Sequence, residues 1–369
     1  MIEPKPTSRK ITMPGEYFHS PQIYDRETRQ IFQKQWLCVG RASEISNSGD
    51  FIVRELDGES VILVRNQDGQ INCFHNLCRH RGTRLKEEAC GELGERIQCP
   101  YHAWSYDLSG KLRSSPGMSH VVGFHQSDYS LFQVTTAIWR GFIFINFDLQ
   151  AIPFERYCDP FQSRFDTWEL ERLVVAHQIT YDLATNWKIV FHNYSECYHC
   201  AMVHPQLSPM TSAETCSNDF VKGPLLGGPM VLSDGCQTLS MGGEICGDGF
   251  SKLLPADRRR VYFYTLFPNL FLSPHPDYFL THRIERRAIG ETRVTCQWLL
   301  PPSVLDRTDF DLSRAIEFWD LTNCQDWHLC ELTYQGVCSP AYQPGPYSSF
   351  ESVLPAFDEH YLETLKNEP

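Results

Sequence analysis

Two short cysteine–histidine pairs are the residues of this chain most suited to holding a metal. Cys78 and His80 form the first pair, and Cys99 and His102 form the second. One type of [2Fe-2S] cluster takes thiolates on one iron and neutral imidazoles on the other, so two such loops could clamp it from both sides. Zinc accepts the same four donors in a tetrahedral site, and the ligand count alone leaves a structural zinc site open.

A second group of candidate ligands lies further along the chain, in the run from Glu196 to His204. His199 and His204 are five residues apart, and a regular helix does not place that spacing on one face, so a helix must break or bulge between them. Two histidines and one carboxylate leave positions open on ferrous iron for dioxygen and substrate. Glu196 is three residues before His199, which would place both on one helix face. Its carboxylate could accept a hydrogen bond from the imidazole of His199, or it could be an ordinary solvated charge on the helix.

The residues around these ligands resemble a known family. The runs 76–82 (NLCRHRG) and 99–104 (CPYHAW) are similar to the Rieske domain of ring-hydroxylating oxygenase α subunits, and this pairing of loops argues against zinc. The segments 186–188, 193–196 and 199–204 match the iron-binding part of the same family.

The resemblance implies a role for each candidate. It assigns the Rieske [2Fe-2S] cluster to Cys78, His80, Cys99 and His102. It assigns a mononuclear Fe(II) to His199 and His204, with Asp326 from a late helix as the third ligand and Asp320 as the fallback. Two other thiols, Cys73 and Cys90, match no ligand position and are expected to be ordinary core or loop residues.

Glu196 is implied to be an electron relay. In the family, a carboxylate at this position bridges a Rieske histidine of one subunit and an iron-binding histidine of the neighbouring subunit. Of the two Rieske histidines, we favour His102 over His80 as the one that is bridged. Many relatives carry aspartate there, so glutamate is a departure that changes the reach of the side chain. A homotrimer arranged head to tail is the implied assembly.

Composition is that of an ordinary globular protein with room for two domains. The 369 residues are 42% hydrophobic and 21% charged. Thirty-three basic residues against 45 acidic ones give a net charge of -12, which argues against a nucleic-acid partner. The sequence shows neither an apolar leader nor a run of about twenty apolar residues, so we expect a cytoplasmic protein without a membrane span. Most of the fifteen cysteines are then expected to be reduced.

The first half of the chain predicts mainly strands. Apolar and β-branched runs separated by Asp-Gly turns predict strands at 51–56, 60–65 and 70–74, a hairpin within 103–112 and a buried strand at 137–147. Before them, an acidic first turn and an apolar face predict a helix at 25–36.

The second half predicts a sheet with helices. Asn186 is expected to cap a helix that starts at Trp187 and leads into the iron motif. Residues 205–255 are rich in glycine and proline and are expected to be loops that cover a pocket. Strands are expected at 173–183, 260–267, 270–273, 278–286 and 292–300, and a last helix at 310–334.

These elements predict an α+β protein. The resemblance implies an all-β Rieske domain and a START-like helix-grip catalytic domain with a curved antiparallel sheet and flanking helices. We place an N-terminal arm and a helix packing on the catalytic domain at 1–39, the Rieske domain at 40–148 and the catalytic domain at 149–369.

The implied activity is that of a terminal oxygenase, which uses O2 and electrons taken from NAD(P)H by a separate flavin and iron–sulfur reductase. Stretches at 196–200, 223–230 and 267–278 resemble the branch that demethylates glycine betaine and related quaternary ammonium compounds. Hydroxylation of an aromatic or alicyclic ring is the alternative, and a Rieske electron carrier with a non-catalytic ligand-binding domain is a third.

A cationic small-molecule substrate would be bound by aromatic faces. Candidates for such a cage are Tyr262, Phe263, Tyr264, Phe267, Phe271 and Tyr278. Aromatic residues on alternating strands more often fill a sheet core, so none of the six is assigned to the site.

Overall fold

The computed structural model describes residues 10–305, 307 and 310–366, so the first nine residues of the predicted N-terminal arm lie outside it. It forms two compact units, Gln33–Tyr157 and Met1–Phe32 together with Cys158–Pro369. These units divide the chain at 32/33 and 157/158, whereas the predicted domains divide it at 39/40 and 148/149. The predicted domain bounds therefore stay a prediction.

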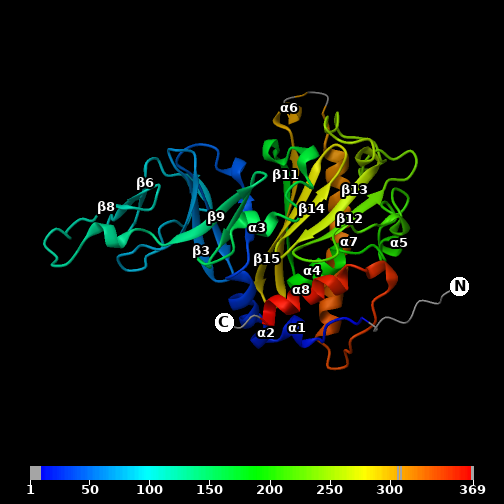
Figure 1. Cartoon of the computed structure of the whole chain (residues 1–369), viewed down its shortest axis with the longest axis horizontal. Helices are drawn as coiled ribbons and strands as arrows, with labels where there is room; N and C mark the ends of the chain where they lie inside the picture. The colour runs from blue at the N-terminus through cyan, green and yellow to red at the C-terminus, as the bar shows by residue number, and fades with distance from the viewer. Residues whose placement is uncertain (1–9, 306, 308–309, 367–369) are drawn as a thin grey trace. The chain divides into compact units, whose positions relative to one another are not determined.

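The smaller unit consists mainly of strands, in a seven-stranded and a three-stranded antiparallel sheet (Figure 1). The larger sheet has the order β1-β10-β9-β4-β3-β2-β5, and the smaller sheet has the order β6-β7-β8. The strands are β1 (Leu37–Arg41), β2 (Asp50–Leu56), β3 (Glu59–Arg65), β4 (Ile71–His75), β5 (Cys90–Glu92), β6 (Arg96–Gln98), β7 (Ser105–Asp107), β8 (Leu112–Ser114), β9 (Gln133–Trp139) and β10 (Phe142–Asn146), and the short helix α3 spans Phe154–Cys158.

Tight turns set the registers of these strands. β2 and β3 pair from Leu56 opposite Glu59, and the two residues between them, Asp57 and Gly58, both have positive φ, as a primed hairpin turn requires. The single strand predicted at 137–147 is wrong, because a second turn of this kind at Arg140 and Gly141 folds the run into β9 and β10.

The larger unit is built on a curled six-stranded antiparallel sheet with the order β11-β16-β15-β14-β13-β12 (Figure 1). Its strands are β11 (Val174–Leu183), β12 (Leu225–Val231), β13 (Arg260–Leu266), β14 (Leu270–Pro274), β15 (Phe279–Ala288) and β16 (Glu291–Leu300). Its helices are α1 (Glu16–His19), α2 (Pro21–Glu27), α4 (Trp187–Tyr194), α5 (Cys200–Val203), α6 (Pro302–Leu305), α7 (Ser313–Val337) and α8 (Leu354–Lys366). Among the described residues, no helix is both long and apolar enough to cross a membrane.

The core of this unit lies between the sheet and α7. Phe318 and Trp319 of α7 belong to one buried cluster with Tyr278, Leu280 and Trp298 of the sheet region. These packing contacts hold the long helix α7 over the sheet.

Helix α4 lies against α7. The Asn186 side chain accepts a hydrogen bond from the Lys188 amide and caps α4, as predicted.

Two further elements differ from the sequence prediction. The helix predicted at 25–36 begins earlier, at Pro21, because Ser20 caps it, and it ends in a π-helical turn at Phe32. The region 205–255 is not all loop, because β12 forms one edge of the sheet.

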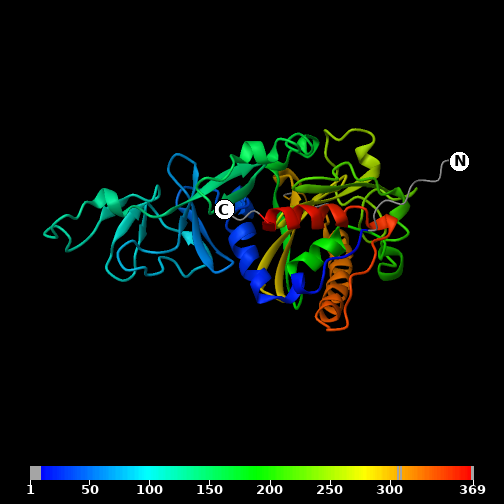
Figure 2. The ribbon, with the colours of Figure 1, turned by 60° about the horizontal axis from the view of Figure 1, so that its bottom comes forward.

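A buried ion-pair network joins the N-terminal helices to the sheet and to α8. Glu27 is 1% exposed and accepts hydrogen bonds from Lys188 (2.5 Å), Trp187 (3.1 Å), Arg286 (3.0 Å) and Tyr361 (2.7 Å). Figure 2 shows α2 and α8, which carry two of these residues, near the same side of the sheet. Burial lowers the pKa of Lys188, and Glu27 opposes that shift.

Replacing Glu27 with Gln is expected to lower the free energy of unfolding by about 3–5 kcal/mol, because two buried cations lose their carboxylate. The exposed Glu16 provides the control, and E16Q is expected to change this free energy by less than about 0.5 kcal/mol. Urea denaturation of the three proteins measures the difference. Equal midpoints for E27Q and the unchanged protein would contradict this account of the network.

Candidate functional site

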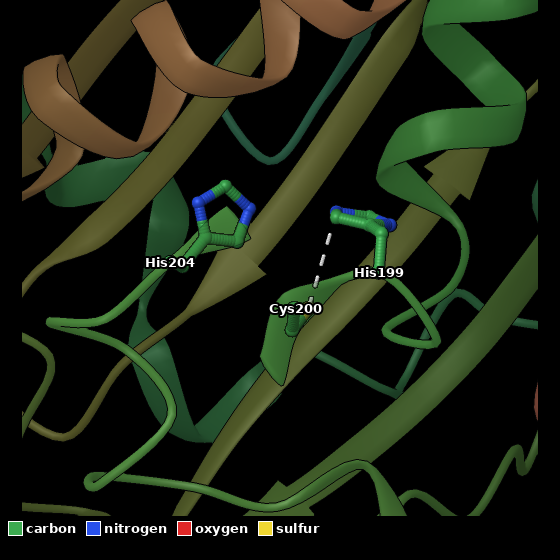
Figure 3. Close-up of side chains that lie close together, drawn as sticks. All are labelled: His199, Cys200 and His204. Atoms are coloured by element: carbon green, nitrogen blue, oxygen red, sulfur yellow. Dashed lines mark hydrogen bonds between the residues drawn. The ribbon is translucent and has the colours of Figure 1, made fainter. Parts of the chain in front are cut away.

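Three of the predicted iron ligands converge in the larger unit. The Nε2 atoms of His199 and His204 lie 3.1 and 3.0 Å from the same oxygen, Oδ1 of Asp326. Figure 3 shows a ring nitrogen of each histidine facing the gap between the two rings. His199 and His204 flank the short helix α5, and α7 brings Asp326 to them across about 120 residues of sequence. Two imidazoles and one carboxylate thus meet at one point, as an iron with open positions requires.

The break or bulge predicted between His199 and His204 is not there, because the helical turn α5 joins the two histidines, with His199 as its N-cap and His204 as its C-cap. The helix breaks before His199 instead. Helix α4 ends at Tyr194, and the irregular stretch that follows leads to His199 and α5. Glu196 lies in this stretch, so the prediction that it shares a helix face with His199 is wrong. Its contact with the imidazole is nevertheless present, with Oε1 at 2.5 Å from Nδ1 of His199.

Each of these two histidines has a partner on its other ring nitrogen. Oε1 of Glu196 lies beside Nδ1 of His199, and Oε1 of Gln325 lies 2.8 Å from Nδ1 of His204. Gln206 donates a hydrogen bond of 2.9 Å to the same Gln325 oxygen. A proton on Nδ1 leaves the Nε2 lone pair free, so these partners orient both rings for metal binding through Nε2.

Electrostatics at this site favour positive charge. Burial alone would lower the pKa of His199, but Asp326 and Glu196 raise it to about 10. Burial would raise the pKa of Asp326, but its hydrogen bonds with His199 and His204 hold that pKa below its usual value. A site with this excess of carboxylate suits a divalent cation.

Asp320, the fallback ligand, lies elsewhere on α7. Its Oδ1 accepts a hydrogen bond of 2.7 Å from Tyr181 on β11. Cys200 comes closer to the histidines, with its Sγ 4.0 Å from Nε2 of His199. That sulfur is bonded to Cys197, however, so it offers no thiolate. Asp326 is thus the residue placed to offer a charged donor beside the two imidazoles.

The predicted cluster ligands lie on two loops of the smaller unit, one after β4 and one between β6 and β7. Cys78 and Cys99 are each 2% exposed, and the rings of His80 and His102 lie 4.8 Å apart between centroids. His80 stacks on Trp104, and its Nδ1 atom is buried without a hydrogen-bond partner among the described residues. Two buried thiols and two neighbouring imidazoles fit the mixed donor set of the cluster.

The protonation states of these donors follow from their surroundings. Burial, His102 and Arg81 lower the pKa of His80, which keeps its imidazole neutral, the form that binds metal. Burial raises the pKa of Cys78, although the Tyr106 hydroxyl, 3.3 Å from its sulfur, opposes this shift. Of the other two thiols, Cys73 is buried on β4, whereas Cys90 is exposed on β5.

Comparison with known proteins decides the family. The family described as "Ring hydroxylating alpha subunit (catalytic domain)" matches residues 170–367, more than half of the chain. The chain belongs to this family. The "Rieske [2Fe-2S] domain" family matches residues 35–128 of this α subunit, which include both cysteine–histidine pairs.

Several relatives and solved structures are similar over almost the whole α subunit. The glycine betaine monooxygenase oxygenase subunit of Pseudomonas aeruginosa is 29% identical over 97% of this chain and 90% of its own length. The choline monooxygenase of Arabidopsis thaliana is 25% identical over 96% of this chain and 83% of its own. A crystal structure of the quaternary ammonium Rieske monooxygenase CntA, solved with an inhibitor, has a TM-score of 0.83 and 22% identity over 97% of this chain and 96% of that one, and so shows the shared fold.

The α subunit is therefore a Rieske-type non-haem iron oxygenase, with an α+β fold of the predicted kind. Its cofactors are a Rieske [2Fe-2S] cluster and a mononuclear iron, and O2 is its co-substrate. The zinc alternative is excluded by the Rieske match, and the simple electron carrier is excluded by the catalytic-domain match.

Sequence reasoning missed three features of the site. Gln325 precedes Asp326 directly, and a polar neighbour of a predicted ligand is the signal that could have found it. The Cys197–Cys200 disulfide follows a C-x-x-C spacing that was visible in the sequence. Trp319, which lines the cavity beside the ligands, is one of many apolar residues on α7, and nothing in the sequence distinguishes it.

Proposed function

We propose that this α subunit hydroxylates an N-methyl group of a quaternary ammonium compound. One oxygen atom of O2 enters a C–H bond, and the other leaves as water with two electrons and two protons. The resulting carbinolamine loses formaldehyde and a proton, and a demethylated amine remains. The observation that carries this proposal is the aromatic lining of the cavity at the histidine–aspartate site.

Three aromatic rings line this cavity together with the proposed iron ligands: Tyr194, Phe263 and Trp319. The ring of Phe263 lies 6.0 Å from that of Tyr194 and 6.2 Å from that of Trp319, between centroids, with angles of 71° and 59°. Aromatic faces attract alkylammonium cations, so rings that line the cavity beside the proposed ligands suit a substrate of this kind.

Among the six aromatic residues considered from the sequence, only Phe263 belongs to the described lining of this cavity. The other five are buried, each at most 3% exposed. Most of the predicted candidates thus fill the core, as their strand positions favoured.

The relatives support the same substrate class. They are named for glycine betaine, carnitine and choline, and each of these compounds carries a trimethylammonium group. Naphthalene 1,2-dioxygenase from Rhodococcus sp. shares the fold, with a TM-score of 0.80 at 19% identity, and that likeness concerns the fold alone.

The proposed roles of the site residues follow from their contacts. His199, His204 and Asp326 would hold the iron, which supplies the activation of O2 when bound. Glu196 and Gln325 fix the two imidazoles, and the aromatic rings hold the substrate beside the ligands. Asn193 donates a hydrogen bond of 3.2 Å to Asp326 and limits rotation of its carboxylate.

Electron supply requires partners in this proposal. A flavin and iron–sulfur reductase would pass electrons from NAD(P)H to the cluster held by Cys78, His80, Cys99 and His102. In a head-to-tail homotrimer, His102 of one subunit would reach Glu196 of the next. Glu196 and His199 also line a second cavity, together with residues such as Ile189 and Leu329. In this proposal the neighbouring subunit's histidine would reach Glu196 from the side of that second cavity, away from the aromatic rings.

The proposed reaction can be measured directly. Reconstituted with a reductase, the enzyme is expected to release about one formaldehyde for each O2 consumed with a trimethylammonium substrate. Formaldehyde trapping and an oxygen electrode give the two quantities. A ring-hydroxylated product accumulating from an aromatic or alicyclic substrate, with no formaldehyde from ammonium compounds, would contradict the proposal and favour the alternative.

A further inference from the structure

Two of the three aromatic rings that line the cavity carry a polar group that is held from behind the cavity wall. The indole Nε1–H of Trp319 donates a hydrogen bond of 2.7 Å to the hydroxyl of Tyr278. The Tyr194 hydroxyl is hydrogen-bonded to the Ser273 hydroxyl. Tyr278 and Ser273 are both fully buried, and neither belongs to the described lining of the cavity. Each of these two rings is thus anchored by a residue of the layer behind it.

Both anchors lie at one turn of the sheet. Ser273 is near the end of β14, and Tyr278 directly precedes β15. The turn between them is itself fixed, because the His275 amide donates to the Tyr278 carbonyl at 3.0 Å and the Trp168 indole donates to the His275 carbonyl at 2.9 Å. A single turn therefore holds two cavity rings that come from different helices, α4 and α7.

The Tyr278 hydroxyl is itself held in one orientation. It donates a hydrogen bond of 2.5 Å to the carbonyl of Leu239, so its only proton points there and its lone pairs are left for the indole of Trp319. The ring of His275 stacks on Tyr278, with 4.2 Å between centroids, and makes a T-shaped contact of 5.6 Å with Trp319. These contacts restrict rotation of the Trp319 ring.

Loss of the Tyr278 oxygen would release that ring. The buried indole N–H would have no acceptor, which is costly for a polar group away from water. Both ring nitrogens of His275 are buried without a hydrogen-bond partner among the described residues. Burial holds the pKa of His275 well below its ordinary value, so its ring is neutral and one nitrogen can accept. The indole of Trp319 is therefore expected to turn toward His275 and leave its place in the cavity wall.

An ammonium group is more sensitive to such a movement than an uncharged group of the same shape. The attraction between a cation and an aromatic ring requires the cation to lie over the ring face, within about 6 Å of the ring centre. The binding of an uncharged alkyl group depends on the apolar area that is buried, whatever the direction of the ring. The orientation of the rings therefore affects the selectivity for a cation more than it affects apolar contact.

We propose that Tyr278 and Ser273 are positioning residues for the substrate. Through Trp319 and Tyr194, they set the selectivity of the cavity for a trimethylammonium group over an uncharged group of the same shape. This inference rests on the proposed function, and it assigns part of the substrate recognition to residues behind the cavity wall.

Equilibrium binding to the oxidised holoenzyme, measured by calorimetry without a reductase, tests this inference. Each cation is paired with the isostere in which a tert-butyl group replaces the trimethylammonium group: choline with 3,3-dimethylbutan-1-ol, and glycine betaine with 3,3-dimethylbutanoate. The ratio of the two affinities measures the selectivity for the cation, and the pair with the tighter-binding cation is used. Y278F is expected to lower this ratio by about tenfold. The metal site is the same in each protein, so its charge does not affect the comparison between variants.

Two further variants distinguish positioning from a general loss of stability. Tyr262 is another buried tyrosine of the same sheet, and its hydroxyl donates to Asp257 away from the cavity. Y262F removes this buried hydrogen bond and is expected to leave the ratio unchanged. W319F lacks the indole N–H that Tyr278 holds, so adding Y278F to W319F is expected to lower the ratio no further.

S273A provides an independent arm, because it frees the hydroxyl of Tyr194, and it is also expected to lower the ratio. A ratio in Y278F or S273A equal to that of the unchanged protein would overturn the inference and leave the proposed function standing. Separate effects of W319F and Y278F that simply add in the double variant would also overturn it. An unchanged protein that binds neither cation, or binds each cation no more tightly than its isostere, would instead overturn the proposed function.

Discussion

Replacing Asp326 with Asn is expected to reduce the iron content from about three to about two atoms per chain, and to abolish oxygenation. The carboxylate oxygen at 3.0 and 3.1 Å from the two histidine Nε2 atoms is the charged donor of the proposed ligand set. An amide is neutral and binds ferrous iron far less well, so the mononuclear site should empty while the cluster, on other residues, stays loaded.

Asp320 offers a matched control, because it lies on the same helix and was the alternative ligand in the sequence. Its carboxylate accepts a hydrogen bond from Tyr181 and does not join the histidine pair. D320N is expected to keep about three irons per chain. Metal analysis gives the iron content per chain of each variant, and the visible absorbance of the cluster gives the number of clusters per chain. The difference between the two is the mononuclear iron. Loss of the mononuclear iron from D320N, and its retention in D326N, would reverse the assignment.

Replacing Glu196 with Gln is expected to slow transfer of electrons from the cluster to the mononuclear iron by about a hundredfold, equivalent to about 2.7 kcal/mol in the barrier. The amide can still hold the imidazole of His199 in place, so both metals should remain bound. What is lost is the negative charge that would join two histidines across the subunit boundary.

Stopped-flow measurement of cluster reoxidation, with the substrate bound and O2 added, isolates this step. Aspartate keeps the negative charge on a shorter side chain, so E196D is expected to recover part of the rate. Glu214 is exposed and outside the site, and E214Q serves as the control for an amide substitution. Rapid reoxidation and unchanged turnover in E196Q would contradict the relay role.

The cysteine–histidine pairs and the histidine pair could be found in the sequence because the donors of each pair are close together, whereas the metals were assigned from the family resemblance. Cys78 and His80, or His199 and His204, are each within one local segment, so their spacing shows that they can share a metal but leaves the choice of metal open. Asp326 comes from a helix more than a hundred residues away, and the family resemblance rather than the spacing pointed to it. The structure places it at the histidines, and its role there remains a proposal.

Elements whose residues are constrained by packing were predicted less well. Strand β12 contains two glycines and a proline, which normally indicate a loop. A Cβ atom at Gly227 would lie 2.0 Å from the carbonyl oxygen of Phe263, so glycine is required there by the close approach of the next strand. Which aromatic residues face the cavity depends on the curl of the sheet and the rotation of α7, and neither can be read from composition.

A single turnover of the chemically reduced enzyme tests the central claim most directly, because it needs no reductase. The holoenzyme is reduced, freed of excess reductant, mixed with a methyl-labelled trimethylammonium substrate and exposed to O2. We predict labelled formaldehyde and the demethylated amine in equal amounts, with the same treatment of D326N giving neither. A product that keeps all of its labelled methyl groups and has gained oxygen elsewhere would contradict N-methyl hydroxylation.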